Sequence, residues 1–147
     1  FKGLAHRCEF VANIRGVTYV DDSKGTNVAA SATALRSLTG PKIVILGGQG
    51  KGEEYAPLAE AVKSEAVAAV VLGAEKERIV KALKEAAFPH IHEVSSMEEA
   101  VQTASTLAFP QSTVLLSPAC TSWDMYPNYK KRGEHFQQLV LALEDER

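Results

Sequence analysis

The sequence predicts one α/β domain with a mostly parallel sheet, flanking helices and an N-terminal antiparallel hairpin. Alternating apolar residues at 8–12 and 17–20 enclose a short Asn/Gly turn, which is typical of a hairpin. Continuous apolar runs at 42–46 and 66–72 are typical of strands that are buried on both faces of a parallel sheet. Helical apolar spacing then alternates with short strand-like runs, and this alternation indicates β–α units.

The other elements follow from apolar spacing and from the residues at the ends of each run. We expect further strands at 90–94 and 113–116, and helices at 27–38, 58–63, 75–86 and 97–107. Thr26 or Asn27 is expected to cap the first helix, and Ser95 or Ser96 the helix at 97–107. A final helix is indicated by apolar residues at i, i+3, i+4 and i+7, namely Phe136, Leu139, Val140 and Leu143. No stretch has the composition of a linker, so we expect residues 1–147 to form a single domain.

The composition restricts the class of protein. A chain of 147 residues with 46% hydrophobic and 23% charged residues is long enough for one domain with a full core. The formal net charge of −2 gives no field that would attract nucleic acid, and no apolar run is long enough to span a bilayer. Two cysteines, Cys8 and Cys120, are too few for a disulfide scaffold, so a reducing cytoplasm is expected. The chain begins at Phe1 and its only methionines are Met97 and Met125, so we expect a piece of a longer protein.

Open α/β sheets bind ligands at the carboxyl ends of their strands, where three loops here are rich in polar residues and glycine: 21–27, 47–54 and 117–124. The first joins a strand to a helix N-terminus, whose free N–H groups favour anions. Lys24 adds a cation there, and Asp22 adds an acceptor for a hydroxyl group or a metal-bound water. The alternative is an ordinary helix cap, because Asp, Gly and Asn commonly fill such loops.

The second and third loops offer groups that could bind anions. The glycine-rich stretch at 47–52 lacks the spacing of a Walker A phosphate loop, but its glycines would let Lys51 reach a bound anion. The alternative is an ordinary exposed lysine. In the third loop, hydroxyl and backbone N–H groups could bind a carboxylate, and the alternative is a turn in which Trp123 fills a hydrophobic gap. Cys120 has no histidine near it in the sequence, so we expect a small buried cysteine rather than a nucleophile.

Three basic segments outside these loops each allow two interpretations. Arg7 could reach a nucleotide phosphate or could be an ordinary surface arginine. His90 and His92 alternate along a short strand and share a face, where we expect a half-exposed sheet surface rather than a metal site. The Lys-Lys-Arg run at 130–132 is predicted to be the solvated start of the last helix.

Four motifs, taken together, resemble those of one known family. They are His-Arg-Cys-Glu-Phe-Val at 6–11, Asp-Ser-Lys-Gly-Thr-Asn at 22–27, Leu-Gly-Gly-Gln-Gly-Lys at 46–51 and Leu-Ser-Pro-Ala-Cys-Thr-Ser at 116–122. Their order and spacing, together with residues 128–136, resemble the C-terminal domain of the Mur ligases over nearly the whole chain. Within the family, the motifs are most similar to those of the ligases that add D-glutamate to UDP-N-acetylmuramoyl-L-alanine. The resemblance implies a Rossmann-like fold.

The resemblance also implies an ATP-dependent amide ligase of peptidoglycan synthesis. In this family ATP phosphorylates the carboxylate of the UDP-linked substrate, and the amine of the incoming amino acid attacks the acyl phosphate. Mg²⁺ bridges the phosphates, and the P-loop and metal-holding residues lie in a central domain that no part of this sequence resembles. We therefore expect this chain to be inactive alone and to work with its own N-terminal and central domains. A cytoplasmic monomer without nucleic-acid or membrane partners is expected.

Residue roles are transferred by position from the motifs of the family. Three residues are implied to contact the nucleotide. Asp22 is implied to contact the ribose, and Arg7 and Lys24 are implied to contact the phosphates. Three residues are implied to hold the carboxylates of the amino-acid substrate: Thr26, Lys51 and Ser122. The backbone near Trp123 and the ring of Tyr129 are implied to line the same site. No metal ligand is implied on this chain. The two aromatic residues stand where aliphatic and phenylalanine side chains are common in the family, and Gly25 stands where alanine is common.

Other functions stay open at this point. A free-standing Rossmann-like module that binds a nucleotide without catalysis is favoured by the lack of a complete catalytic set. Another Mur ligase or a folylpolyglutamate synthetase shares the implied architecture, but the Asn-Pro-Arg motif of the diaminopimelate-adding ligase is absent from the sequence. A flavodoxin-like carrier is disfavoured, because the first strand–helix turn holds no hydroxyl-rich phosphate loop.

Overall fold

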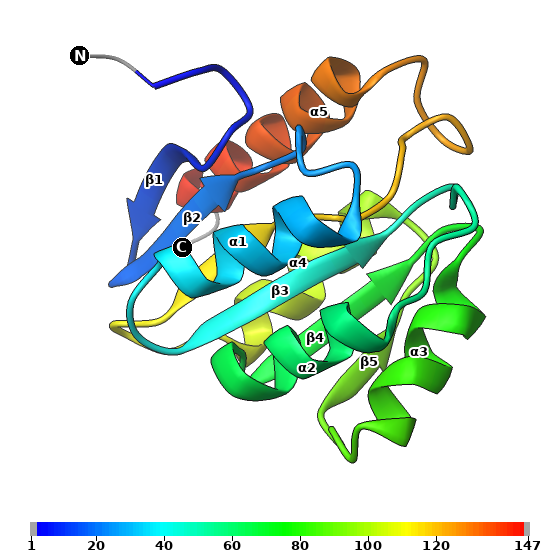
Figure 1. The fold of residues 1–147 in the computed structure, drawn as a ribbon. Coiled ribbons are helices and arrows are strands. Elements are labelled where there is room, and N and C mark those ends of the chain that lie inside the picture. Colours follow the sequence, from blue (N-terminus) through cyan, green and yellow to red (C-terminus); the bar gives the residue numbers. More distant parts are fainter. Residues whose placement is uncertain (1–2, 146–147) are drawn as a thin grey trace.

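A six-stranded sheet forms the centre of the molecule in the computed structural model, which describes residues 3–145 (Figure 1). From the N-terminus its strands are β1 (Glu9–Ile14), β2 (Val17–Asp21), β3 (Lys42–Gly47), β4 (Ala68–Leu72), β5 (Ile91–Glu93) and β6 (Thr113–Leu116). Their order in the sheet is β1-β2-β6-β3-β4-β5, with β1 antiparallel to β2 and the other neighbours parallel. The predicted α/β class, mostly parallel sheet and N-terminal hairpin are confirmed.

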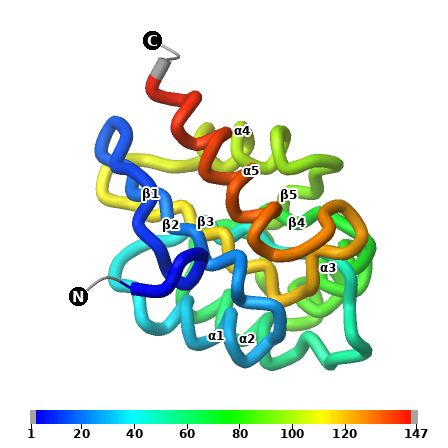
Figure 2. The backbone as a smooth tube through the Cα atoms, turned by 90° about the horizontal axis from the view of Figure 1, so that it is seen from above, coloured from blue at the N-terminus to red at the C-terminus, as the bar shows by residue number. Residues whose placement is uncertain are grey.

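Helices cover both faces of this sheet. They are α1 (Val28–Ser37), α2 (Ala56–Glu65), α3 (Lys76–Glu85), α4 (Met97–Leu107), α5 (Tyr129–Ala142) and the short 3-10 helix η1 (Leu143–Asp145). Helices α1, α2 and α3 pack on one face, and α4 and α5 pack on the other, as the view from above shows (Figure 2). None of the helices in the described part of the chain has the length and apolarity that a membrane crossing requires.

Side chains that alternate along β3 supply both hydrophobic cores. Val44 packs in the same cluster as Leu35 of α1, on the face that α1 to α3 cover. Its neighbour Ile43 packs in the cluster on the opposite face, which contains Phe136 of α5. All four side chains are fully buried. A strand with a helix layer on each face has no solvated side, which explains its continuous apolar run.

Element boundaries lie within two residues of those predicted from the sequence. The helix predicted at 58–63 extends two residues further at each end, as α2. In the run at 66–72, β4 begins two residues late because Ala66 caps the C-terminus of α2 and donates its N–H to the Val62 carbonyl over 2.8 Å. Of the alternative caps, Asn27 caps α1 and Ser96 caps α4, each side-chain oxygen accepting a backbone N–H from the first turn.

The position of β6 brings the ends of distant strands together. Although β6 is the last strand in the sequence, it lies between β2 and β3 in the sheet. Leu116 pairs with Asp21 on one side and with Ile45 on the other. The carboxyl ends of these three strands therefore lie next to one another, and the three predicted ligand loops leave the sheet at the same edge.

Candidate functional site

Three loops meet at the carboxyl edge of the sheet, and we call them the first (21–27), second (47–54) and third (117–124) loop. The third lies between the other two. Its Ala119 N–H donates to the Gly25 carbonyl of the first loop over 2.9 Å. On its other side, Thr121 exchanges two backbone hydrogen bonds of 2.9 and 3.0 Å with Gln49 of the second loop. The loops thus form one hydrogen-bonded surface rather than three independent segments.

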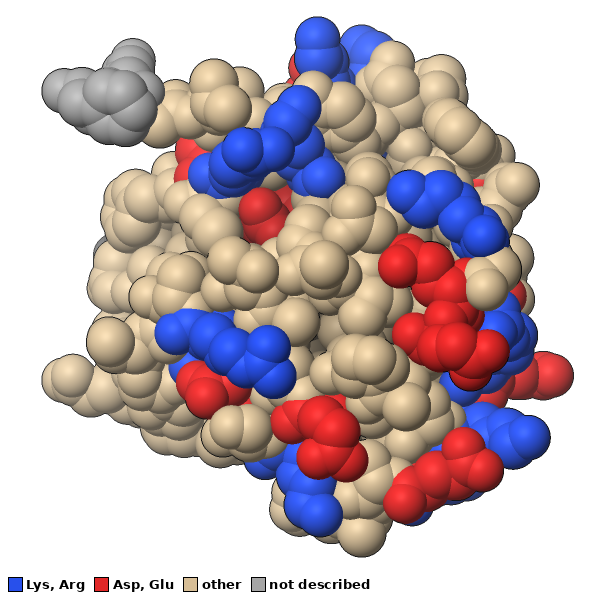
Figure 3. Space-filling model, viewed as in Figure 1, with Lys and Arg blue, Asp and Glu red and all other residues tan. Residues whose placement is uncertain are grey.

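The three residues implied to contact a nucleotide line one pocket. Arg7, Asp22 and Lys24 surround a volume of about 380 Å³ together with Ala30 and Thr33 of α1. Basic side chains cross the upper part of this face in Figure 3, where the N-terminal segment and the β2–α1 loop lie in Figure 1. The structure therefore places Arg7 beside the first loop, although its sequence context alone allows either a surface residue or a phosphate ligand.

Asp22 is held in one orientation at the rim of this pocket. Its Oδ2 accepts a hydrogen bond of 2.6 Å from the Ser117 hydroxyl, and its Oδ1 accepts one of 3.1 Å from the Cys8 N–H. Burial raises the pKa of the carboxyl group, although both hydrogen bonds act in the opposite direction. A Cβ atom at Gly25 would lie 2.6 Å from the Asp22 carboxylate, so glycine permits this close approach.

Tyr129 lies against Lys24. The Lys24 ammonium donates to the Tyr129 hydroxyl over 3.2 Å and stands 4.8 Å from the centre of its ring. That hydrogen bond lowers the pKa of the phenol. The ring also meets the His6 ring edge-on, with centroids 6.2 Å apart. The structure thus places Tyr129 beside a residue of the nucleotide group, and its implied contact with the amino-acid substrate stays a prediction.

Ser122 carries an unsatisfied polar atom. Among the described residues, its Oγ is the one buried side-chain nitrogen or oxygen atom that has no hydrogen-bond partner. A buried hydroxyl without a partner costs free energy, which makes Ser122 a candidate for binding a ligand. Thr26 is half-buried at the end of the first loop, and Lys51 is exposed in the second. The Lys51 ammonium has no hydrogen-bond or ion-pair partner within the described range of the chain.

Trp123 does not fill a hydrophobic gap, so that alternative is wrong. Trp123 is 64% exposed. The backbone turns after Ser122, whose carbonyl accepts hydrogen bonds from the N–H groups of Met125 and Tyr126 over 3.0 and 2.7 Å. Trp123 and Met125 leave exposed apolar surface beside the site.

The second loop is anchored on both sides of Lys51. On one side, a Cβ atom at Gly50 would overlap the carboxylate of Glu75, so only glycine permits this contact. The carboxylate is itself fixed by the Tyr55 hydroxyl at 2.8 Å and by Arg78 at 2.6 Å. On the other side, Arg78 donates to the Glu53 carbonyl over 3.0 Å. Lys51 therefore stands exposed between two fixed points.

Arg132 was predicted to lie on a solvated helix start, and this is wrong for its side chain. Lys130 and Lys131 are exposed, but Arg132 is 2% exposed. Its guanidinium donates to the Ser23 hydroxyl, the Ser23 carbonyl and the Cys120 carbonyl over 2.9, 2.8 and 3.0 Å. Arg132 thus connects the first loop to the third. Burial lowers its pKa to about 10, so the group stays charged at neutral pH.

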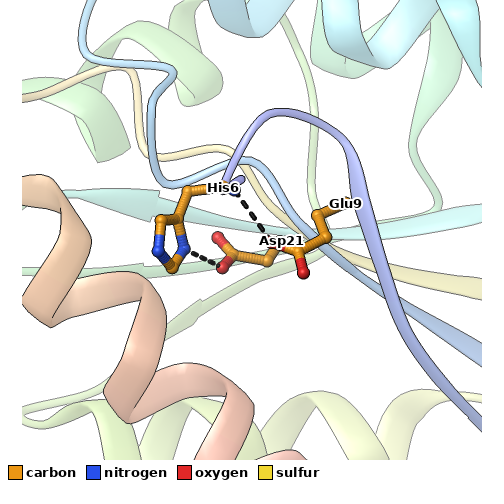
Figure 4. A group of neighbouring side chains, drawn as sticks. All are labelled: His6, Glu9 and Asp21. Atoms are coloured by element: carbon orange, nitrogen blue, oxygen red, sulfur yellow. Dashed lines mark hydrogen bonds and ion pairs between the residues drawn. The ribbon is translucent and has the colours of Figure 1, made fainter. Parts of the chain in front are cut away.

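Three potential metal ligands lie close together: His6, Glu9 and Asp21 (Figure 4). The His6 Nδ1 lies 2.6 Å from the Asp21 carboxylate, and the His6 N–H donates to Glu9 over 2.9 Å. The Gln137 amide donates to both carboxylates, over 3.2 Å to Glu9 and 2.7 Å to Asp21. Because these atoms already bind one another, the cluster has the character of a structural network rather than of a metal centre.

Cys120 is a buried cysteine, as predicted. It is 1% exposed, and burial raises its pKa to about 11, which disfavours the thiolate that a nucleophile needs. The exposed His90 precedes β5, and the half-buried His92 lies on it at the edge of the sheet. Neither belongs to a potential metal-binding group in the described part of the chain.

The chain matches known proteins over most of its length. Residues 6–120 match the family model described as "Mur ligase, glutamate ligase domain". Two relatives, both named UDP-N-acetylmuramoylalanine--D-glutamate ligase, are 49% identical over 146 residues in Shewanella violacea and 45% identical over 143 residues in Pelotomaculum thermopropionicum. In each case 97% of this chain aligns with only 31% of the relative, so the chain spans about a third of its relatives' length.

A solved structure agrees with this assignment at the level of the fold. The MurF ligase from Thermotoga maritima, solved in complex with ADP, superposes on 100% of this chain with a TM-score of 0.64 and 18% sequence identity. The match covers 33% of the MurF chain. The structural match shows the fold, and the match of residues 6–120 to the family model, over more than half of the sequence, shows that the chain belongs to the Mur ligase family and matches its glutamate ligase domain.

Proposed function

We propose that this chain is the C-terminal domain of an ATP-dependent ligase that adds D-glutamate to UDP-N-acetylmuramoyl-L-alanine. This reaction, a step of peptidoglycan synthesis, would pass through an acyl phosphate and release ADP and phosphate. The observation that carries the proposal is that a pocket lined by Arg7, Asp22 and Lys24 opens at the same sheet edge as Lys51 and Ser122. The names of relatives that are 43–49% identical support the choice of D-glutamate.

On the nucleotide side, we assign Arg7 and Lys24 to the phosphates of ATP and Asp22 to a ribose hydroxyl. Two cations suit a polyphosphate, and a carboxylate held by Ser117 suits a hydroxyl donor. Mg²⁺, when bound, would supply positive charge that offsets the negative charge of the phosphates. We assign its protein ligands to the central domain, since the carboxylates beside His6 already accept hydrogen bonds within the described chain.

On the amino-acid side, we assign the donors Thr26, Lys51 and Ser122 to the two carboxylates of D-glutamate. Charge-assisted hydrogen bonds are the strong ones, so an ammonium and an unsatisfied buried hydroxyl fit two anionic groups. The backbone near Trp123 and the ring of Tyr129 would line the same site. None of these groups needs to bind the substrate amine, which must stay free to attack the acyl phosphate.

The rest of the protein would complete the active site. We propose that N-terminal and central domains outside residues 1–147 supply the ATPase residues and the site for the UDP-linked substrate. The isolated domain is then expected to be inactive, because a site shared between domains is incomplete in either part. We place the ligase in the cytoplasm as a monomer, without nucleic-acid or membrane partners.

Replacing Lys51 tests the amino-acid site. In the full-length ligase, Lys51→Ala is expected to raise the KM for D-glutamate roughly 10-fold to 100-fold, since one charge-assisted hydrogen bond is lost. The KM for ATP should stay within about twofold, because ATP is assigned to different residues. Steady-state ADP release, with each substrate varied in turn, measures both constants.

Lys63→Ala is the matched control, since it removes an exposed lysine from α2. It should change neither constant. If Lys51→Ala altered both KM values, or neither, Lys51 would not bind D-glutamate as assigned. The proposed reaction itself fails if the wild-type enzyme releases no ADP with D-glutamate but does so with another amino acid.

A further inference from the structure

The turn that presents Arg7 has an unfavourable backbone. Its neighbours His6 and Cys8 both have positive φ angles, 63° and 43°. Residues other than glycine rarely adopt positive φ angles. Because two such residues flank Arg7, the conformation of this turn is not one that the chain prefers by itself. Strain of this kind persists only where surrounding contacts over-determine the conformation, and it is concentrated at functional sites.

The contacts that impose this turn centre on His6. Its side chain and both of its backbone polar groups are hydrogen-bonded: Nδ1 lies 2.6 Å from Asp21, N–H donates to Glu9 over 2.9 Å, and the carbonyl accepts from Lys24 over 2.9 Å. Figure 4 shows the imidazole directed at the Asp21 carboxylate. His6 is 9% exposed and Asp21 is fully buried. In a buried setting a charge-assisted hydrogen bond is strong enough to determine local geometry.

Helix α5 completes this network. Gln137 donates to Asp21 over 2.7 Å and to Glu9 over 3.2 Å, which fixes the carboxylate that His6 binds. A Cβ atom at Gly133 would overlap the His6 ring, so only glycine at that position leaves room for it. The turn is therefore specified by residues from the N-terminal segment, β2 and α5. Arg7 itself is exposed, and its guanidinium has no ion-pair partner among residues 3–145.

We propose that His6 is the positioning residue for Arg7: its bond to Asp21 holds the strained turn and directs the guanidinium to the pocket shared with Lys24. This inference rests on the proposed role of Arg7 as a phosphate contact. His6 does not touch the nucleotide in this scheme. His6 orders Arg7 before the nucleotide binds, so less conformational entropy is lost on binding. Such preorganisation strengthens binding without adding a contact.

Three substitutions at His6 separate the side-chain bond from the backbone strain. His6→Gly removes the bond and relaxes the positive φ, so the KM for ATP in the full-length ligase should rise roughly 10-fold to 100-fold. The KM for D-glutamate should change by less than about twofold. His6→Asn keeps a donor near the Nδ1 position and tolerates positive φ, so it should restore most of the ATP affinity. His6→Ala supplies neither property and should be at least as defective as His6→Gly.

A double-mutant cycle with Arg7→Met shows whether His6 acts through Arg7. If it does, His6→Gly adds little to Arg7→Met, whereas independent effects would add. Additive effects would overturn the inference, as would His6→Gly raising both KM values equally or leaving the KM for ATP unchanged. The failure of the proposed function looks different, because Arg7→Met alone would then leave the KM for ATP at the wild-type value.

Discussion

Replacing Arg132 with methionine is expected to lower the free energy of unfolding of the 147-residue chain by about 3–5 kcal/mol. Methionine fills much of the same volume, but it cannot donate the three hydrogen bonds that Arg132 makes to Ser23 and Cys120. Two buried carbonyl groups would then lose their donors, and each such loss carries the cost of desolvation. Urea unfolding followed by circular dichroism measures the change.

Lys131→Met is the control for this variant, because it changes a neighbouring cation on the same helix turn. Lys131 is exposed, and among the described residues its ammonium forms a single ion pair, at the surface, with Glu134 at 3.3 Å. Its replacement should cost less than about 1 kcal/mol. If Arg132→Met were as stable as Lys131→Met, the buried guanidinium would not be what joins the first and third loops.

Replacing Gly47 with alanine is expected to lower the free energy of unfolding by about 3–5 kcal/mol, through strain and overpacking together. Gly47 ends β3 with a φ of 123° and pairs with Leu72 of the parallel neighbour β4. A Cβ atom there would overlap the Leu72 carbonyl oxygen, which cannot move without breaking the ladder. Thermal and urea unfolding of the variant test this expectation.

Gly52→Ala distinguishes the steric overlap from the backbone angle. Gly52 also has a positive φ, 82°, but nothing lies within 4 Å of the position of its Cβ atom. Alanine there should cost only about 1–2 kcal/mol, which is the penalty of the left-handed region itself. Equal costs at both positions would mean that the close approach of β3 and β4 does not require Gly47.

Local patterns were sufficient for most of the secondary structure. The run at 42–46 is apolar on both faces because helices cover both sides of β3, and hydrophobic periodicity reports burial directly. Sequence patterns leave two candidate N-caps for each of the helices α1 and α4. For α1 the structure selects Asn27, because its side chain accepts the Ala30 N–H. The start of β4 was placed too early, because alanine and valine fit the end of α2 as well as a strand.

The sequence also identified the residues that line the candidate pocket, through motifs in loops that follow strands. The residue pattern alone leaves Arg7 as either a surface arginine or a phosphate ligand, and the resemblance to the Mur ligases implies the second; the structure shows that Arg7 lines the same pocket as Asp22 and Lys24. The sequence could not show that Arg132 is buried, because a Lys-Lys-Arg run at a helix start has the composition of a solvated surface. Arg132 lies far along the chain from Ser23, so no local sequence pattern predicts that the two residues are hydrogen-bonded.

The sequence by itself determined the α/β class, the mostly parallel sheet and the positions of the three candidate ligand loops, because these depend on local periodicity and on short motifs. The tertiary structure alone decided which of those loops meet. The insertion of β6 between β2 and β3 places the third loop against both of the others. It also decided which polar atoms are satisfied, leaving the Ser122 hydroxyl without a partner. Both outcomes depend on contacts between residues that are distant in the chain, and no local pattern encodes such contacts.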